Sequence, residues 1–136
     1  MRYLFLLLFL GGAISGFSQT IIKDSIFFEA DQSYRQYQVW LPKDYADDKQ
    51  YHTIYCFDAE LLFNVLVANV ELYSDPFIAK LPPAIVVGLY FEHRNDDMGI
   101  QWEEGELNKN GLAFKTMVEE QLVSEVEERY AVSEYR

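Results

Sequence analysis

Cysteine, histidine and positive charge are scarce in this sequence of 136 residues. One cysteine cannot form an internal disulfide, and two histidines far apart do not make a zinc site, so no metal and no cofactor are expected. Only 11 lysines and arginines stand against 22 acidic residues, for a formal net charge of -11. Nucleic acids and anionic membranes bind clustered positive charge, so neither is an expected partner.

The single cysteine, Cys56, lies within the apolar run "TIYCFD". Such a position predicts a buried core residue with an unreactive thiol. A catalytic thiol is the alternative, but it requires exposure and a positioned partner group, which the middle of a strand does not supply.

Residues 1–18 have the pattern of a secretory signal peptide. One basic residue, Arg2, precedes a short apolar run, and small residues follow that run up to Ser18. The run is too short to span a bilayer, which favours cleavage before Gln19 over a membrane anchor. The sequence therefore predicts a secreted or periplasmic domain at residues 19–136, with no membrane association after cleavage.

Half of the residues are hydrophobic and 16% are aromatic, which is enough apolar surface for one packed domain. Short apolar runs predict strands over 24–30, 34–41, 52–58 and 84–91. The second run alternates with a period of two, whereas the third and fourth are continuously apolar and predict strands covered on both faces. Residues 91–110 are polar and are expected to be irregular.

Two helices are predicted from apolar stripes. The first follows Asp58, and its stripe consists of Leu61, Leu62, Val65, Leu66, Asn69, Leu72 and Tyr73. The second spans residues 112–130, and its stripe consists of Phe114, Val118, Leu122, Val126 and Tyr130. Five of its glutamates are expected to face solvent: Glu119, Glu120, Glu125, Glu127 and Glu128.

Buried strands separated by helices predict βαβ units, so the expected fold class is α/β. The order is two leading strands, then strand, helix, strand and helix. Ligands bind beyond the carboxyl ends of the strands in such sheets. Here those ends are Asp58-Ala59-Glu60 and the loop that begins Glu92-His93-Arg94.

The last residues, "SEYR", resemble the start of another strand. A sheet with helices on both faces normally carries a strand after its last helix, and without one it keeps an open edge. The pattern therefore predicts the first half of a domain, truncated at Arg136.

Four segments carry a resemblance to a known family: "YRQYQVWLPKDY", "YHTIYCFDAELLF", "AIVVGLYFEHRNDDM" and "FKTMVEEQLVSEVEERYAVSEYR". They resemble the N-terminal half of secreted esterases of the α/β-hydrolase superfamily, related to esterase D, feruloyl esterases and enterochelin esterases. The resemblance spans residues 33–136. It depends on the order and spacing of "LPKDY", a strand that ends in Asp58, and a helix that ends in Tyr-x-x-x-x-x-Arg.

In that family, the strand that starts at "YR" leads into a Gly-x-Ser-x-Gly turn that exposes a serine nucleophile. The acid and the histidine of the triad come later in the chain. The resemblance therefore implies the N-terminal half of an α/β-hydrolase sheet that stops before the nucleophile strand. No catalytic side chain is expected in this chain.

The resemblance also implies an oxyanion-hole donor in the loop after the third strand, at the backbone N–H of Ala59 or Glu60. The family usually has glycine after the aspartate, and Ala59 tolerates a positive φ less readily. Capping of the following helix is the alternative role for Asp58 and Glu60.

Asp58, His93 and Arg94 are the expected substrate-binding residues. Arg94 could clamp an acidic or hydroxyl-rich substrate, and its alternative is a solvated ion pair with Asp96 or Asp97. His93 is the one candidate base at a strand's carboxyl end, but no serine stands in a Gly-x-Ser-x-Gly setting.

Two functions from different classes remain after these observations. The first is the N-terminal fragment of an exported serine esterase, inactive alone, whose substrate is a small-molecule or carbohydrate-linked ester. The second is a complete, non-catalytic secreted domain that binds a sugar or peptide through aromatic strands and Trp102.

Overall fold

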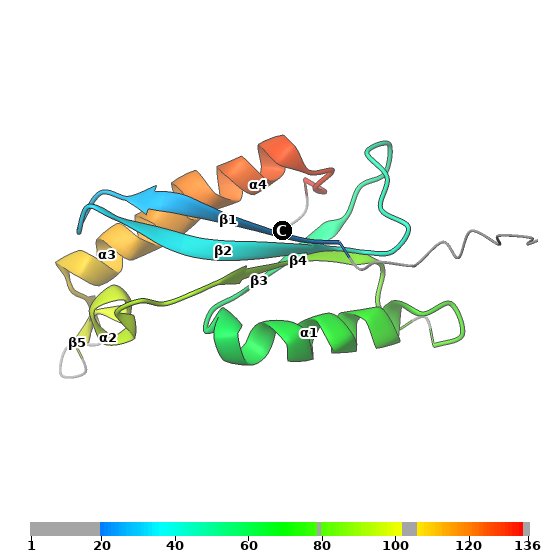
Figure 1. Ribbon diagram of the computed structural model, residues 1–136, viewed down its shortest axis with the longest axis horizontal. Helices are drawn as coiled ribbons and strands as arrows, with labels where there is room; N and C mark the ends of the chain where they lie inside the picture. The colour runs from blue at the N-terminus through cyan, green and yellow to red at the C-terminus, as the bar shows by residue number, and fades with distance from the viewer. Residues whose placement is uncertain (1–19, 79, 102–105, 135–136) are drawn as a thin grey trace, which may run out of the picture.

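The computed structural model describes residues 20–78, 80–101 and 106–134 (Figure 1). The four main strands are β1 (Thr20–Phe28), β2 (Ser33–Leu41), β3 (His52–Cys56) and β4 (Ala84–Leu89). They form one sheet in the order β1-β2-β4-β3. β2 is antiparallel to both β1 and β4, and β3 is parallel to β4. The expected α/β class is confirmed, with one parallel pair in a mixed sheet.

Helices cover both faces of this sheet (Figure 1). The face towards α1 (Ala59–Ser74) packs through Trp40, Ala59, Phe63, Val67, Val70, Ala84 and Val86. The other face lies under α3 (Lys109–Thr116), the π-helical segment η1 (Met117–Leu122) and α4 (Val123–Arg129). Its core consists of Ile26, Phe28, Tyr37, Val39, Leu41, Tyr51, Ile85, Val87, Leu89, Phe114, Met117, Leu122 and Val126.

Coverage of both faces decides the burial of each strand. β4 lies between two strands and two helix layers, and every one of its residues is buried, as its continuous apolar run predicts. β2 is buried on both faces towards its end, so the expected one-sided alternation is wrong: Gln38 and Trp40 face α1 and are 6% and 2% exposed. β3 packs on both faces as predicted, through Tyr55 on one and through Ile54 and Cys56 on the other, but it lies at the edge of the sheet and is only half-buried.

The predicted apolar stripe of the first helix is wrong. The side of α1 that faces the sheet carries Ala59, Phe63, Val67 and Val70. The predicted stripe points outward: Leu61, Leu62, Val65, Leu72 and Tyr73 are 72, 50, 59, 52 and 42% exposed. The helix has two apolar stripes, and the inner one prevails because Phe63 and Ala59 fit against Gly88 of β4.

The second predicted helix begins earlier than expected. Asn108 caps it, and its side chain accepts hydrogen bonds from the backbone N–H groups of Asn110 and Gly111. The π-helical segment shifts the buried stripe, so Met117 and Val123 join Phe114, Leu122 and Val126 inside, while Val118 and Tyr130 are half-buried.

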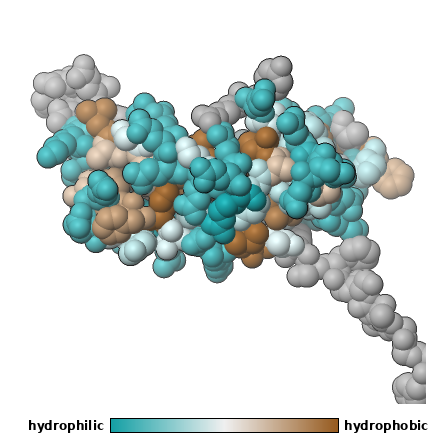
Figure 2. Space-filling model, turned by 90° about the horizontal axis from the view of Figure 1, so that it is seen from above, coloured by the Kyte–Doolittle hydropathy of each residue, from teal (hydrophilic) through white to brown (hydrophobic). Residues whose placement is uncertain are grey.

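Four of the five glutamates face solvent as predicted, and the mainly hydrophilic surface of this layer is seen in Figure 2. Glu125 is the exception. It is half-buried because its carboxylate accepts a hydrogen bond of 2.9 Å from the Tyr37 hydroxyl of β2.

The parts of residues 91–110 that the structure describes are not irregular throughout, contrary to the expectation. They contain the short helix α2 (Arg94–Met98) and two short antiparallel strands, β5 (Ile100–Gln101) and β6 (Glu106–Leu107). The backbone N–H of Gly99, at a φ of 44°, ends α2 by donating to the carbonyl of Asn95. This gives the loop after β4 a defined shape.

The residues after α4 lie along the outer edge of β3. The backbone N–H of Tyr51 donates to Ala131 at 2.9 Å, and that of Ser133 donates to Tyr51 at 2.8 Å. They make a parallel bridge between Tyr51 and Val132. The bridge is isolated and precedes most of the predicted strand start at 133–136, of which residues 135 and 136 lie outside the described residues, so that strand stays a prediction.

Candidate active-site edge

The two predicted site loops meet at one edge of the sheet. Cys56 pairs with Gly88 near the carboxyl ends of the parallel strands β3 and β4, so the loops that follow them lie side by side. Arg94 Nε donates a hydrogen bond of 2.9 Å to Asp58 Oδ1. The predicted substrate-binding residues Asp58 and Arg94 therefore contact each other.

The ion pair of Arg94 lies at the surface, since its side chain is 58% exposed and that of Asp58 is 22% exposed. The alternative role for Arg94 was a solvated ion pair with Asp96 or Asp97. The ion pair is present at the surface, but its partner is Asp58. Asp97 points away from Arg94 into the interior, where it pairs with Arg35.

Asp58 holds the sharp turn into α1. Its backbone is left-handed, with φ 52° and ψ 47°, a conformation that aspartate adopts more readily than most residues. The positive φ that would have strained alanine at position 59 is found at Asp58 instead. The Asp58 side chain makes no capping hydrogen bond, so the predicted side-chain cap is wrong, because its carboxylate is bound to Arg94.

Ala59 and Glu60 are the first two residues of α1, which has 16 residues. The first N–H groups of a helix have no acceptor within the helix, and the helix dipole makes this end positive. Leu61 already donates to the carbonyl of Asp58 at 2.9 Å. The N–H groups of Ala59 and Glu60 come before this first donor, and their role as oxyanion donors remains a prediction.

Gly88 allows α1 to begin this close to the sheet. A Cβ added at Gly88 would lie 2.5 Å from Phe63 Cδ2 and 3.0 Å from Ala59 Cβ. Ala59 is 3% exposed at this contact. The position of the candidate oxyanion loop therefore depends on a glycine in β4.

His93 faces a different hollow. It occupies the N-cap position of α2 without a side-chain cap and lines a pocket of about 150 Å³. The other lining residues are Phe28, Ala30, Asp31, Asp96, Asp97 and Asn110. The structure thus separates His93, on the side of the β1–β2 turn, from the contact between Asp58 and Arg94.

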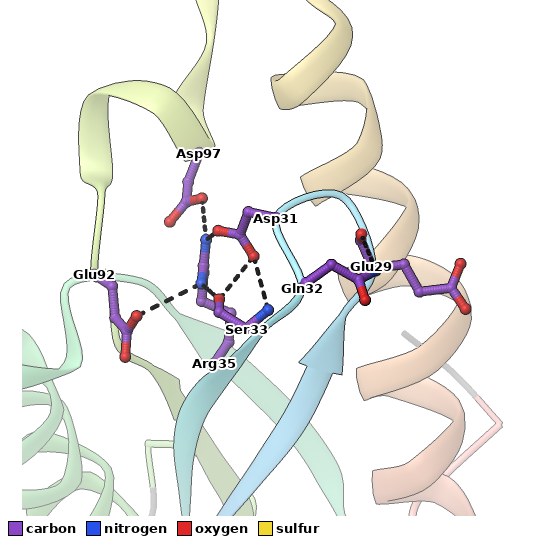
Figure 3. Close-up of polar contacts among 7 residues, drawn as sticks. All are labelled: Glu29, Asp31, Gln32, Ser33, Arg35, Glu92 and Asp97. Carbon is purple, nitrogen blue, oxygen red and sulfur yellow. Dashed lines mark hydrogen bonds and ion pairs between the residues drawn. The ribbon is translucent and has the colours of Figure 1, made fainter.

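A functional candidate that the sequence reasoning missed is Arg35 of β2. Its side chain is 0% exposed, and its guanidinium donates to Asp97 at 2.8 Å and also to Asp31 and Ser33 (Figure 3). Burial lowers the pKa of Arg35, but the hydrogen bonds to Asp97 and Asp31 outweigh burial and raise it, so the group stays charged. The signal in the sequence was that Arg35 alternates with the apolar positions Tyr37 and Val39, which places it on the same face of the strand. An arginine on such a face is rarely buried without an acidic partner.

Cys56 is half-buried at the end of β3. Burial raises the pKa of its thiol, so the protonated and less nucleophilic form is favoured. This agrees with the prediction of an unreactive residue, although Cys56 is less buried than expected.

Within residues 20–78, 80–101 and 106–134, no group of three or more His, Cys, Asp or Glu side chains is arranged to hold a metal ion. In the same part of the chain, no helix is long and apolar enough to cross a membrane. The predicted signal peptide and Trp102 lie outside these ranges.

No family model matches the chain, and no curated protein matches it. Solved structures do match. An uncharacterised protein from Capnocytophaga ochracea DSM 7271 has a TM-score of 0.76 at 23% identity, over 85% of this chain and 31% of that chain. The IroE-like serine hydrolase from Shewanella oneidensis has a TM-score of 0.71 at 18% identity, over 83% of this chain and 40% of that chain. A ferulic acid esterase has a TM-score of 0.60 at 19% identity, over 85% and 46%.

The chain shares its α/β fold with part of each of these structures. It spans less than half the length of each of these three structures. The likeness thus confirms the fold that the sequence resemblance implies. Activity, substrate and site residues remain to be argued from the edge where Asp58 and Arg94 meet.

Proposed function

We propose that this chain is the N-terminal part of an exported serine carboxylic-ester hydrolase. It supplies the oxyanion-hole donors Ala59 and Glu60 and one wall of the substrate pocket. The nucleophile, the acid and the histidine come from polypeptide beyond Arg136. The observation that carries this proposal is the free N-terminus of α1 at the carboxyl edge of β3 and β4, in a fold shared with a serine hydrolase and an esterase.

The chemistry assigned to this chain is electrostatic. When a serine attacks an ester carbonyl, negative charge develops on the carbonyl oxygen. Fixed N–H groups at that oxygen stabilise the transition state, and the loss of one such donor costs roughly 3 kcal/mol. Ala59 and Glu60 offer two donors, and the α1 dipole adds positive potential at the same point.

The substrate class is a small-molecule or carbohydrate-linked ester. Arg94 lies beside the candidate oxyanion loop with an exposed guanidinium, which suits a carboxylate or a hydroxyl-rich group. The names of the ferulic acid esterase and of the enterobactin and salmochelin hydrolase IroE describe enzymes that act on such esters.

The alternative, a non-catalytic domain that binds a sugar or peptide, requires strand aromatics at the surface. Tyr37 and Trp40 are 1% and 2% exposed, whereas the paired rings of Phe27 and Tyr34 are 38% and 60% exposed. These two rings are where such a ligand would stack on the strands. Trp102, the other aromatic residue of that hypothesis, lies outside the described residues.

The test compares two purified proteins, the 136-residue chain and the product of the complete reading frame. We expect the reading frame to continue past Arg136 into a Gly-x-Ser-x-Gly turn. That product should hydrolyse p-nitrophenyl acetate and lose the activity when its serine is replaced by alanine, whereas the 136-residue chain should match buffer. A stop codon directly after Arg136 would overturn the proposal. So would activity of the 136-residue chain that survives chromatography.

A further inference from the structure

One buried guanidinium holds both ends of the segment that carries His93 and Arg94. Arg35 lies 2.8 Å from Asp97 in α2 and 3.7 Å from Glu92, where the chain leaves β4 (Figure 3). Arg35 and Asp97 are 62 residues apart in the sequence. The loop after β4 is therefore fastened at its start and at its end to the neighbouring strand β2.

Arg35 is itself held firmly. It belongs to β2, next to the turn after β1, and that turn supplies Asp31 and Ser33 as hydrogen-bond acceptors. On another side its guanidinium lies 4.9 Å from the centre of the Phe28 ring. The fully buried side chain has little freedom to move, so its contacts fix the loop relative to the sheet.

Arg94 joins the fastened segment to the candidate oxyanion loop. Arg94 is the first residue of α2, and its Nε donates to Asp58 Oδ1 at 2.9 Å. Asp58 holds the left-handed turn that directly precedes Ala59. A continuous path of contacts thus leads from Arg35 through Asp97 and Arg94 to Asp58.

We propose that Arg35 is a positioning residue for the candidate active-site edge: through Asp97 and Glu92 it sets the loop whose Arg94 orients Asp58. The contacts stand without any enzymatic assignment. Only their effect on catalysis rests on the proposed function, which makes Ala59 and Glu60 the oxyanion donors.

A purely stabilising role explains the cluster less well. Two buried atoms in it, Arg35 Nε and Asp97 Oδ2, have no hydrogen-bond partner among the described residues. Buried ion pairs contribute little net stability even when every atom is paired, because desolvation opposes them. An incompletely paired cluster that joins two distant segments is better explained by the geometry it imposes.

The test measures amide hydrogen exchange in the purified gene product, residue by residue. Asp97→Asn keeps the shape of the side chain and removes its charge. Charge-assisted hydrogen bonds are strong enough that their loss should speed local exchange about tenfold. We expect this increase at Asp96 and Gly99, whose amides donate to carbonyls of the α2 segment, and at Leu61 and Leu62, whose amides donate to Asp58, with the amides of β4 unchanged. Arg35→Lys, which loses the planar fork, should give the same pattern.

Two further variants isolate the path. Arg94→Ala removes only the last contact, so it should speed exchange at Leu61 and Leu62 and leave Gly99 unchanged. Arg129→Lys is the matched control, because Arg129 also joins acidic groups from two elements, Asp24 and Glu125. It should leave the candidate edge unaffected.

Unchanged exchange at Leu61 and Leu62 in Asp97→Asn would overturn the proposal, as would an equal increase at all amides. If the gene product is an esterase, Asp97→Asn should lower kcat with little change in KM, because oxyanion donors act in the transition state. A gene product without esterase activity that shows the local exchange pattern would refute the proposed function and leave the positioning role intact. Esterase activity with a normal kcat in Asp97→Asn would refute the positioning role alone.

Discussion

Replacing Gly88 by alanine tests how closely α1 packs on β4. The added Cβ would lie 2.5 Å from Phe63 Cδ2, 3.2 Å from Phe63 Cγ and 3.0 Å from Ala59 Cβ. Two of these three neighbours belong to a ring that is 0% exposed and has no free space to turn into. The helix must therefore move away from the strand, or the ring must leave its preferred position.

The magnitude follows from two opposing effects. Overpacking of a filled core costs about 1–3 kcal/mol. Replacing glycine by alanine also lowers the entropy of the unfolded chain, which stabilises the folded state by about 0.4–1 kcal/mol. The net expectation is a loss of about 1–2 kcal/mol in the free energy of unfolding, together with a displaced N-terminus of α1.

Urea unfolding of Gly88→Ala, Phe63→Leu and the double variant measures this effect. Leucine lacks the ring edge that meets the new Cβ, so the double variant should lose less stability than the sum of the two single variants, by about 1 kcal/mol. Additive losses would show that the ring does not limit the approach. Full stability of Gly88→Ala would refute the close packing itself.

Three other changes give distinct outcomes. Burial raises the pKa of Asp31, but its hydrogen bonds from Ser33 and Arg35 outweigh burial and lower it. The carboxylate therefore stabilises the fold above its unfolded pKa near 3.8, and this contribution is lost as the pH falls through the folded pKa. Asp31→Asn should show a smaller acid-induced fall in melting temperature than the parent. Tyr37→Phe leaves Glu125 and Arg129 without the buried hydroxyl between them, and thermal unfolding should show a loss of about 1.5–3 kcal/mol. Leu61 lies on the outer side of α1, where its side chain is 72% exposed. Leu61→Lys should therefore change the free energy of unfolding in urea by less than about 0.5 kcal/mol and raise the solubility of the chain. A large destabilisation would show that this side of α1 is covered in solution.

The order of the four main strands and the two long helical segments could be predicted from the sequence, because alternating or continuous apolar runs lie between turn residues. The meeting of Asp58 and Arg94 was also accessible, since the carboxyl ends of β3 and β4 share one edge. Both inferences use local patterns and one general rule of sheet topology. Neither requires knowledge of a particular contact.

The inner side of α1 and the role of Arg35 could not be predicted in this way. α1 carries apolar residues on two sides, and periodicity alone does not state which side meets the sheet. That choice is made by Gly88, a residue of another element. The acceptors of Arg35 include Asp97, which is 62 residues away, and no local pattern connects the two.

The two arginines of the candidate edge suit different tasks because their surroundings differ. Arg35 is fully buried among acidic groups, and breaking such a pair leaves an uncompensated buried charge, so its partners are fixed. Arg94 is 58% exposed, and an exposed ion pair contributes only about 0–1 kcal/mol. Arg94 contacts Asp58 through Nε, so the terminal nitrogens of its exposed guanidinium can bind a substrate carboxylate while the contact with Asp58 is kept. This difference supports the proposal that Arg94, rather than Arg35, contacts the substrate.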